Sequence, residues 1–113
     1  MTAVGDTFYR YEDLLVSAGV DEFDNPLGPA QVRVYLHQFQ VIRVTPKGVW
    51  IDGWFSKRFV LNEARKRYAL PTKDEALQSF LARKERQASI YQTRVSRADQ
   101  AIKAALAMHG KNA

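Results

Sequence analysis

Residues Thr72 to His109 decide the fold, and their sequence is TKDEALQSFLARKERQASIYQTRVSRADQAIKAALAMH. These 38 residues contain no proline and no glycine, and they are rich in residues that favour helices. Thr72 stands where a helix cap belongs, Glu75 follows three residues later as its capping-box partner, and Gly110 is the expected stop. The stretch predicts one helix, roughly 57 Å long at about 1.5 Å per residue.

A helix of that length is long for a chain of 113 residues. A compact domain of this size has a radius of gyration of only about 13 Å. We therefore expect an α+β fold in which residues 1–70 form a small antiparallel β-sheet of about four strands. Residues 71–110 form the long C-terminal helix, which packs on the sheet and projects from it.

Four segments before the helix are rich in β-branched and aromatic residues and predict strands. They are Thr7 to Leu15, Gln31 to Thr45, Val49 to Ile51 and Lys57 to Leu61. Thr45-Pro46-Lys47-Gly48 predicts a tight hairpin turn. Within the second strand the apolar alternation changes phase after Leu36, which predicts a bulge or bend there. Asn62 is expected to cap a short helical turn over residues 63–67, before Pro71 separates it from the long helix.

The composition excludes several classes of protein. There is no cysteine, so neither a disulfide framework nor a thiolate metal site is possible. No run of 18 apolar residues occurs, and the first residues lack the basic and apolar segments of a leader peptide. We expect a soluble protein that is not exported.

Charge is divided unevenly along the chain, whose net charge is +5. Residues 1–56 hold four basic and seven acidic side chains, whereas residues 57–113 hold thirteen basic and five acidic ones. Such asymmetry indicates that the C-terminal half meets a polyanion or an acidic protein surface. The alternative is a helix surface whose charges serve only solubility.

A heptad seam runs along the predicted helix with spacings of four and three residues. Its members are Leu77, Leu81, Lys84, Ala88, Tyr91, Val95, Ala98, Ile102, Ala105 and His109. We expect the distal seam to meet a partner helix as an oligomer interface, in the manner of a coiled coil, and it consists of Tyr91, Val95, Ala98, Ile102 and Ala105. The alternative is that the seam is only the stripe of the helix that faces the protein's own core.

Beside the seam, about a quarter turn away, lies an arginine stripe formed by Arg83, Arg86, Arg94 and Arg97. Guanidinium groups suit phosphate oxygens, so a rod carrying them at this spacing is expected to bind a nucleic-acid backbone. The cluster Arg65-Lys66-Arg67 is the densest positive segment and is predicted to belong to the same binding function. No motif that reads bases is present, so the predicted binding is non-specific.

The residues that catalysis requires are not grouped in this sequence. His37 and His109 are isolated from other metal ligands, and no nucleophile elbow or phosphate-binding glycine loop is present. We therefore expect no enzyme activity, no metal and no cofactor. One set of aromatic residues offers either a stacking surface for bases or core packing, and it comprises Trp50, Trp54, Tyr9, Tyr11 and Tyr35.

Several segments resemble a group of small proteins of unknown function from tailed bacteriophages and prophages. The resemblance covers residues 31–106, and its most characteristic segments are TPKGVWI at 45–51, KRFV at 57–60, ARKRYA at 64–69 and PTKDEAL at 71–77. It implies a phage accessory protein acting in the cytoplasm of a bacterial host, and it implies no particular activity.

Three functions follow as expectations, in this order. The first is a non-enzymatic, oligomeric protein that binds nucleic acid through its basic helix. The second is a phage-encoded protein that binds or inhibits a host protein, such as one of a defence system, through the same basic surface. The third is a virion or assembly component built through the helical seam.

Overall fold

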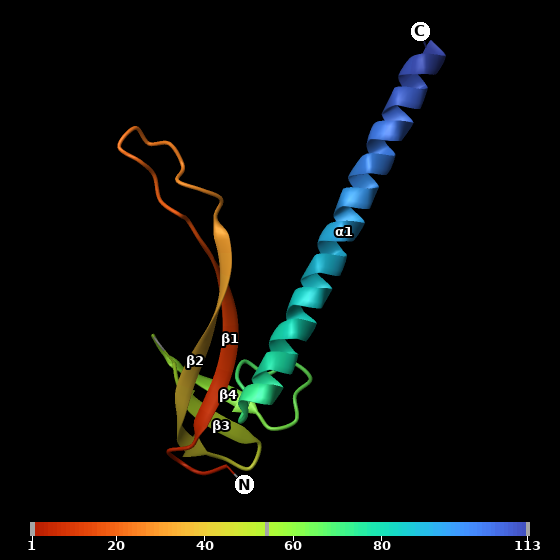
Figure 1. The fold of residues 1–113 in the computed structure, drawn as a ribbon. Helices are drawn as coiled ribbons and strands as arrows, with labels where there is room; N and C mark the ends of the chain where they lie inside the picture. Colours follow the sequence, from red (N-terminus) through yellow and green to blue (C-terminus); the bar gives the residue numbers. More distant parts are fainter. Residues whose placement is uncertain (1, 54, 113) are drawn as a thin grey trace. The chain divides into compact units, whose positions relative to one another are not determined.

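The structure, a computed structural model, describes residues 2–53 and 55–112, with side-chain surroundings described as far as residue 110. Its elements are β1 (Thr7–Val16), β2 (Gln31–Val44), β3 (Gly48–Asp52), β4 (Lys57–Leu61) and α1 (Lys73–Asn112). The strands form one antiparallel sheet in the order β1-β2-β3-β4. The predicted α+β fold, with four strands and a long C-terminal helix, is confirmed (Figure 1).

β1 and β2 are longer than their neighbours β3 and β4 in the sheet. They pair without interruption from Thr7 opposite Gln40 to Val16 opposite Gln31, whereas β3 pairs with β2 only between Val41 and Val44. The outer part of this pair, together with the loop at its end, is therefore a two-stranded arm, residues 13–34, beyond the edge of β3 and β4 (Figure 1).

The apolar residues of β2 change face where the arm joins the sheet. Phe39 and Val41 are buried in the core, whereas Val32 and Val34 lie on the opposite face and are exposed. Of the bulge or bend predicted after Leu36, the bulge is absent, because the register with β1 is continuous there. The irregularity lies instead between Val41 and Arg43, opposite β3.

The core is small and lies on one face of the sheet. Its buried residues are Phe8, Phe39, Val41, Val49, Ile51, Val60 and Ala69, with Tyr68 packed against them. The predicted hairpin turn closes β2 onto β3, since the Thr45 amide donates to the Gly48 carbonyl at 2.8 Å. Trp50 is half-buried against Phe59, and Trp54 lies outside the described residues.

The segment from β4 to α1 is a loop, and the helical turn expected over residues 63–67 is wrong. Arg67 donates from Nη1 to the Asn62 carbonyl at 2.7 Å, which closes the loop across its own base. Leu70 then exchanges two backbone hydrogen bonds with Tyr9 of β1, at 2.7 and 2.9 Å. These two attachments fasten the loop to its own base and to β1.

α1 begins as predicted and ends later than predicted. The Glu75 amide donates to the Thr72 hydroxyl oxygen at 3.1 Å, so Thr72 is the N-cap. The helix continues through Gly110 to Asn112, because Gly110 does not take the left-handed conformation that ends many helices.

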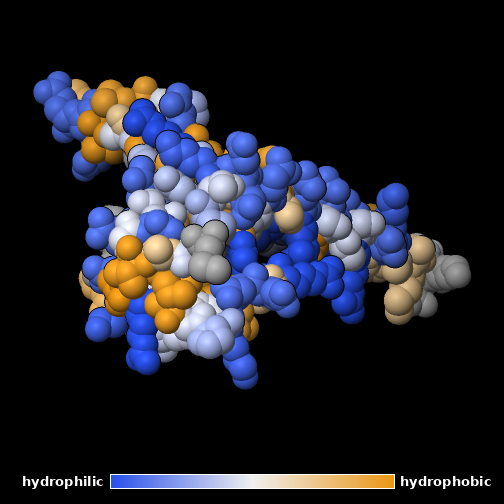
Figure 2. Space-filling model, turned by 90° about the horizontal axis from the view of Figure 1, so that it is seen from below, coloured by the Kyte–Doolittle hydropathy of each residue, from blue (hydrophilic) through white to orange (hydrophobic). Residues whose placement is uncertain are grey.

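The chain divides into two units inside α1. Residues 1–80 form the sheet unit, to which the first two turns of the helix belong, with Ala76 and Phe80 buried. Residues 81–113 form the helical unit, in which no side chain of the described residues is buried. Many apolar side chains are exposed, and Figure 2 shows hydrophobic residues gathered in patches between hydrophilic ones.

Candidate nucleic-acid interface

The arginine stripe lies on the helical unit, and three of its four members are exposed. Arg86, Arg94 and Arg97 make no ion pair with any residue that the structure describes. The guanidinium of Arg94 lies 5.8 Å from the ring centroid of Tyr91, one turn earlier. Arg83, the fourth member, is half-buried, which makes it the least available of the four.

The whole net charge of the protein resides in the helical unit. Residues 1–80 contain ten basic and ten acidic side chains and are neutral. Residues 81–113 contain seven basic and two acidic side chains, a net charge of +5. A neutral body with one strongly basic rod attracts polyanions to the rod.

In the predicted basic cluster of residues 65–67, two side chains are exposed and the third makes contacts within the protein. Arg65 and Lys66 are exposed. Arg67 is largely covered, because besides its hydrogen bond to Asn62 it pairs with the Glu75 carboxylate at 3.5 Å. Arg67 therefore holds the loop against the first turn of α1, and Arg65 and Lys66 are the members of this cluster that solvent reaches. They belong to the sheet unit and the stripe to the helical unit.

The distal seam is exposed along its length. Tyr91, Val95 and Ile102 are each more than half exposed, and a shallow groove beside Tyr91 and Val95 runs along the helix toward Lys103. In proteins, most of the stability of a helix comes from the packing of its apolar face. The distal seam is therefore an apolar stripe that no described residue covers.

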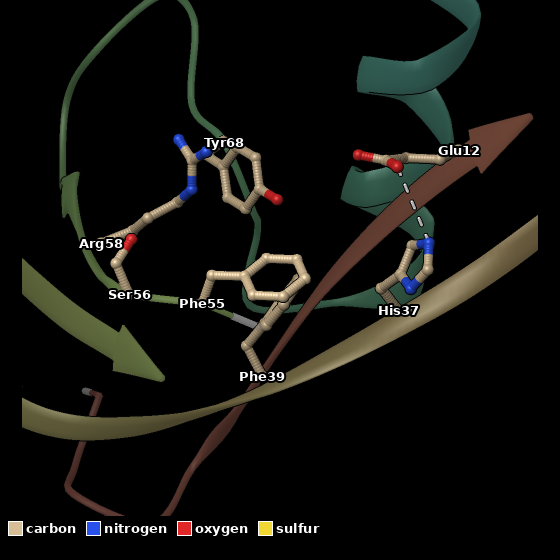
Figure 3. Close-up of a pocket in the computed structure, with 7 residues that line it drawn as sticks. All are labelled: Glu12, His37, Phe39, Phe55, Ser56, Arg58 and Tyr68. Carbon is tan, nitrogen blue, oxygen red and sulfur yellow. Dashed lines mark ion pairs between the residues drawn. The ribbon is translucent and has the colours of Figure 1, made fainter. Parts of the chain in front are cut away.

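A hollow of about 320 Å³ on the sheet unit was not predicted from the sequence (Figure 3). It is lined by Glu12, His37, Phe39, Phe55, Ser56, Arg58 and Tyr68. Figure 3 shows that these side chains come from β1, β2, the β3–β4 connection, β4 and the loop before α1. No local sequence motif predicts the hollow, since its residues are spread over more than fifty positions of the chain.

The polar side chains in and beside this hollow form hydrogen bonds and ion pairs with one another. Arg10 donates from Nε to Glu12 at 2.6 Å and from Nη1 to the Tyr68 carbonyl at 2.7 Å. The second oxygen of Glu12 lies 3.7 Å from Nε2 of His37. The guanidinium groups of Arg10 and Arg58 lie 4.3 and 4.1 Å from the Tyr68 ring centroid. These contacts fasten the loop before α1 onto the sheet.

The described residues contain no group of three or more histidine, cysteine, aspartate or glutamate side chains able to hold a metal ion. Nor does α1, over the residues that the structure describes, contain a segment long and apolar enough to cross a membrane. The chain matches no protein-family model, and neither a curated protein nor a solved structure shows significant similarity to it.

Proposed function

We propose that this protein is a non-enzymatic, self-associating protein that binds nucleic acid without sequence preference through the exposed arginines of α1. The observation that carries the proposal is the combination of charge and availability on the helical unit. That unit holds the entire net charge of +5, and Arg86, Arg94 and Arg97 are exposed without an ion pair to any described residue.

The spacing of these arginines suits a phosphate backbone. The segment from Arg86 to Arg97 spans roughly 16 Å at about 1.5 Å per residue. A length of duplex equal to that span carries about ten phosphate charges. Contacts of this kind fix a protein on the backbone but carry no sequence information, so the binding is expected to be non-specific.

Self-association is the second part of the proposal. The distal seam, defined above as Tyr91, Val95, Ala98, Ile102 and Ala105, is assigned to a second copy of the chain. Two copies would present two arginine stripes to one nucleic acid, which raises the affinity without any new contact.

The proposed setting is the cytoplasm of a bacterial host, where the protein would act as a phage accessory protein. That setting rests on the resemblance of residues 31–106 to small phage proteins of unknown function.

The experiment is fluorescence anisotropy with a labelled mixed-sequence duplex and a labelled single strand, at low and moderate salt. Micromolar binding at low salt that weakens steeply with added salt, with equal affinity for unrelated sequences, supports the proposal. Absent or salt-insensitive binding overturns it. In that event, retention of a host protein from a nuclease-treated lysate would favour a protein partner, and a large oligomer would favour an assembly component.

A further inference from the structure

The arm, residues 13–34, exposes a large apolar surface. Seven large apolar side chains in it are each more than half exposed: Leu14, Leu15, Val20, Phe23, Leu27, Val32 and Val34. A two-stranded ribbon in water is only marginally stable by itself. Apolar surface of this extent marks an interaction site.

The tip of the arm is an ordered turn. The Asp21 carboxylate accepts hydrogen bonds from the amides of Phe23 and Asn25, at 2.8 and 2.9 Å. The Leu27 amide donates to the Gly19 carbonyl at 3.0 Å, which closes the base of the turn. Phe23 is 75% exposed at its end. Because the turn is already ordered, docking of Phe23 costs little additional conformational entropy.

Charge indicates what the arm meets. Residues 13–34 contain four acidic side chains and one basic side chain, a net charge of −3, whereas the helical unit carries +5. No carboxylate in residues 17–30 makes an ion pair with a described residue. The acidic arm and the basic helix are therefore complementary, whereas two helical units repel each other.

The apolar surfaces lead to the same partner. Two of the five distal seam residues are alanines, so a pair of helices buries little apolar area along the seam and leaves both arms exposed. An arm lying on a seam covers both surfaces at once. The lengths are also compatible, since residues 91–105 span roughly 22 Å of helix and residues 13–23 reach at most about 36 Å.

We propose that the arm of one copy docks on the distal seam of a second copy, reciprocally, so that a two-fold dimer contains two identical arm–helix contacts. The inference rests on the self-association named in the proposed function and replaces the expected partner helix by the partner's arm. On the arm, the contact surface is the apolar face that carries Leu15, Val32 and Val34.

Disulfide mapping on the full chain tests the contact, because the natural sequence has no cysteine. Val32→Cys and Val95→Cys place one thiol on the arm and one on the seam, at positions that are 65% and 62% exposed. The two variants, carrying tags of different mass, are mixed under mild oxidation. Val4→Cys, at 65% exposure outside the arm, replaces Val32→Cys in the control mixture.

The expected product is the mixed disulfide of the Val32→Cys and Val95→Cys chains, formed at least tenfold faster than in the control. A predominant Val95→Cys homodimer would show that two helices meet and would overturn the proposal. So would a predominant Val32→Cys homodimer, which would show that two arms meet. A third sample is the chain that carries both Val32→Cys and Val95→Cys. If this chain forms an intrachain disulfide while the single variants form no mixed disulfide, the arm docks on its own helix, and the proposal is overturned as well.

The sign of the salt dependence gives a second, independent readout by analytical ultracentrifugation. An arm–helix dimer weakens with added salt, whereas a dimer of two basic helices strengthens because its repulsion is screened. Glu22→Gln with Asp24→Asn should weaken the dimer by about threefold to tenfold at low salt. Asn suits position 24, where φ is +62°. A dimer that strengthens with salt contradicts the proposal.

Both readouts are taken without nucleic acid, so they are independent of the proposed binding activity. If duplex binding is absent and the mixed disulfide forms, the arm contact stands and the nucleic-acid proposal falls. If duplex binding is present and the mixed disulfide is absent, the reverse holds.

Discussion

Arg10 joins β1 to the loop before α1 through one guanidinium. It pairs with Glu12, donates to the Tyr68 carbonyl and lies over the Tyr68 ring. Arg10→Ala should lower the free energy of unfolding by about 1–3 kcal/mol, because the Tyr68 carbonyl loses a charged donor and the ring loses a cation. Denaturant unfolding measures the change. Arg10→Lys keeps the charge but lacks the planar, multiple-donor geometry of the guanidinium, so it should recover only part of the lost free energy of unfolding. Full recovery would show that the charge alone matters.

Gly48 illustrates a glycine required by a close approach. A Cβ atom at this position would overlap the Val60 carbonyl oxygen on β4 and crowd the Phe59 ring. Gly48→Ala should therefore destabilise the protein by about 1–3 kcal/mol through overpacking. The matched control is Gly110→Ala, where nothing lies within 4 Å and the helical backbone should gain about 0.5–1 kcal/mol. Thermal unfolding of the two variants should shift in opposite directions, and a shift in the same direction would contradict this assignment.

Asp21 makes the tip of the arm sensitive to acid. Hydrogen bonds from the backbone amides of Asn25 and Phe23 lower the pKa of this carboxyl below its ordinary value of 3.8. A lowered pKa in the folded state means that the stabilisation is complete above the ordinary pKa and is lost as the pH falls through the lowered one. An NMR titration should give a midpoint for Asp21 below 3.8. Asp21→Asn should abolish this dependence on pH while keeping an oxygen acceptor, and a midpoint at or above 3.8 would contradict the account.

Residue patterns predicted the local structure well where it depends on neighbours in sequence. Thr72 caps the helix and residues 45–48 form the hairpin turn, as expected from capping and turn preferences. The role of Arg67 was not predictable, because it depends on the Asn62 carbonyl and the Glu75 carboxylate, which the fold brings together. For the same reason the hollow around Tyr68 left no signal in the sequence.

At the scale of elements, β2 shows why a periodic pattern can be interpreted in two ways. Its change of phase after Leu36 predicted a bulge or bend, but the pairing with β1 continues without a bulge, and the apolar residues of the arm lie on the face opposite to the core. The sequence contains the alternation but not the partner strand, so it does not say which face is covered. The distal seam is a similar case, since its exposure became evident only from the structure.

The helical unit should depend on its partner for stability. Val95→Asp with Ile102→Asp puts charges on the seam and should abolish self-association at micromolar concentration and reduce helicity by circular dichroism, because the apolar face loses its partner. Thr93→Asp with Gln100→Asp adds the same charge on the opposite face of the helix and serves as the control. Equal loss of helicity in both variants would mean that the seam is not the stabilising surface.

At the scale of the whole molecule, the division of charge is the feature that connects the fold to the proposed function. A neutral sheet unit bears an acidic arm, and the helical unit holds the whole net charge. The sequence predicted the basic half of the chain, but its division at residue 57 differs from the division of the structure at residue 80. Only the structural boundary separates a neutral body from a basic rod.

The most direct test of the central claim is the slope of log K against log salt for duplex binding. Arg86→Gln, Arg94→Gln and Arg97→Gln together should reduce the slope by about 2.7, because each lost phosphate contact removes about 0.9. Arg43→Gln, Lys47→Gln and Lys57→Gln remove the same charge from exposed positions of the sheet unit outside the arm and should leave the slope nearly unchanged. Equal reductions in the two variants would show that net charge alone attracts the duplex, and that the arginine stripe is not the binding surface.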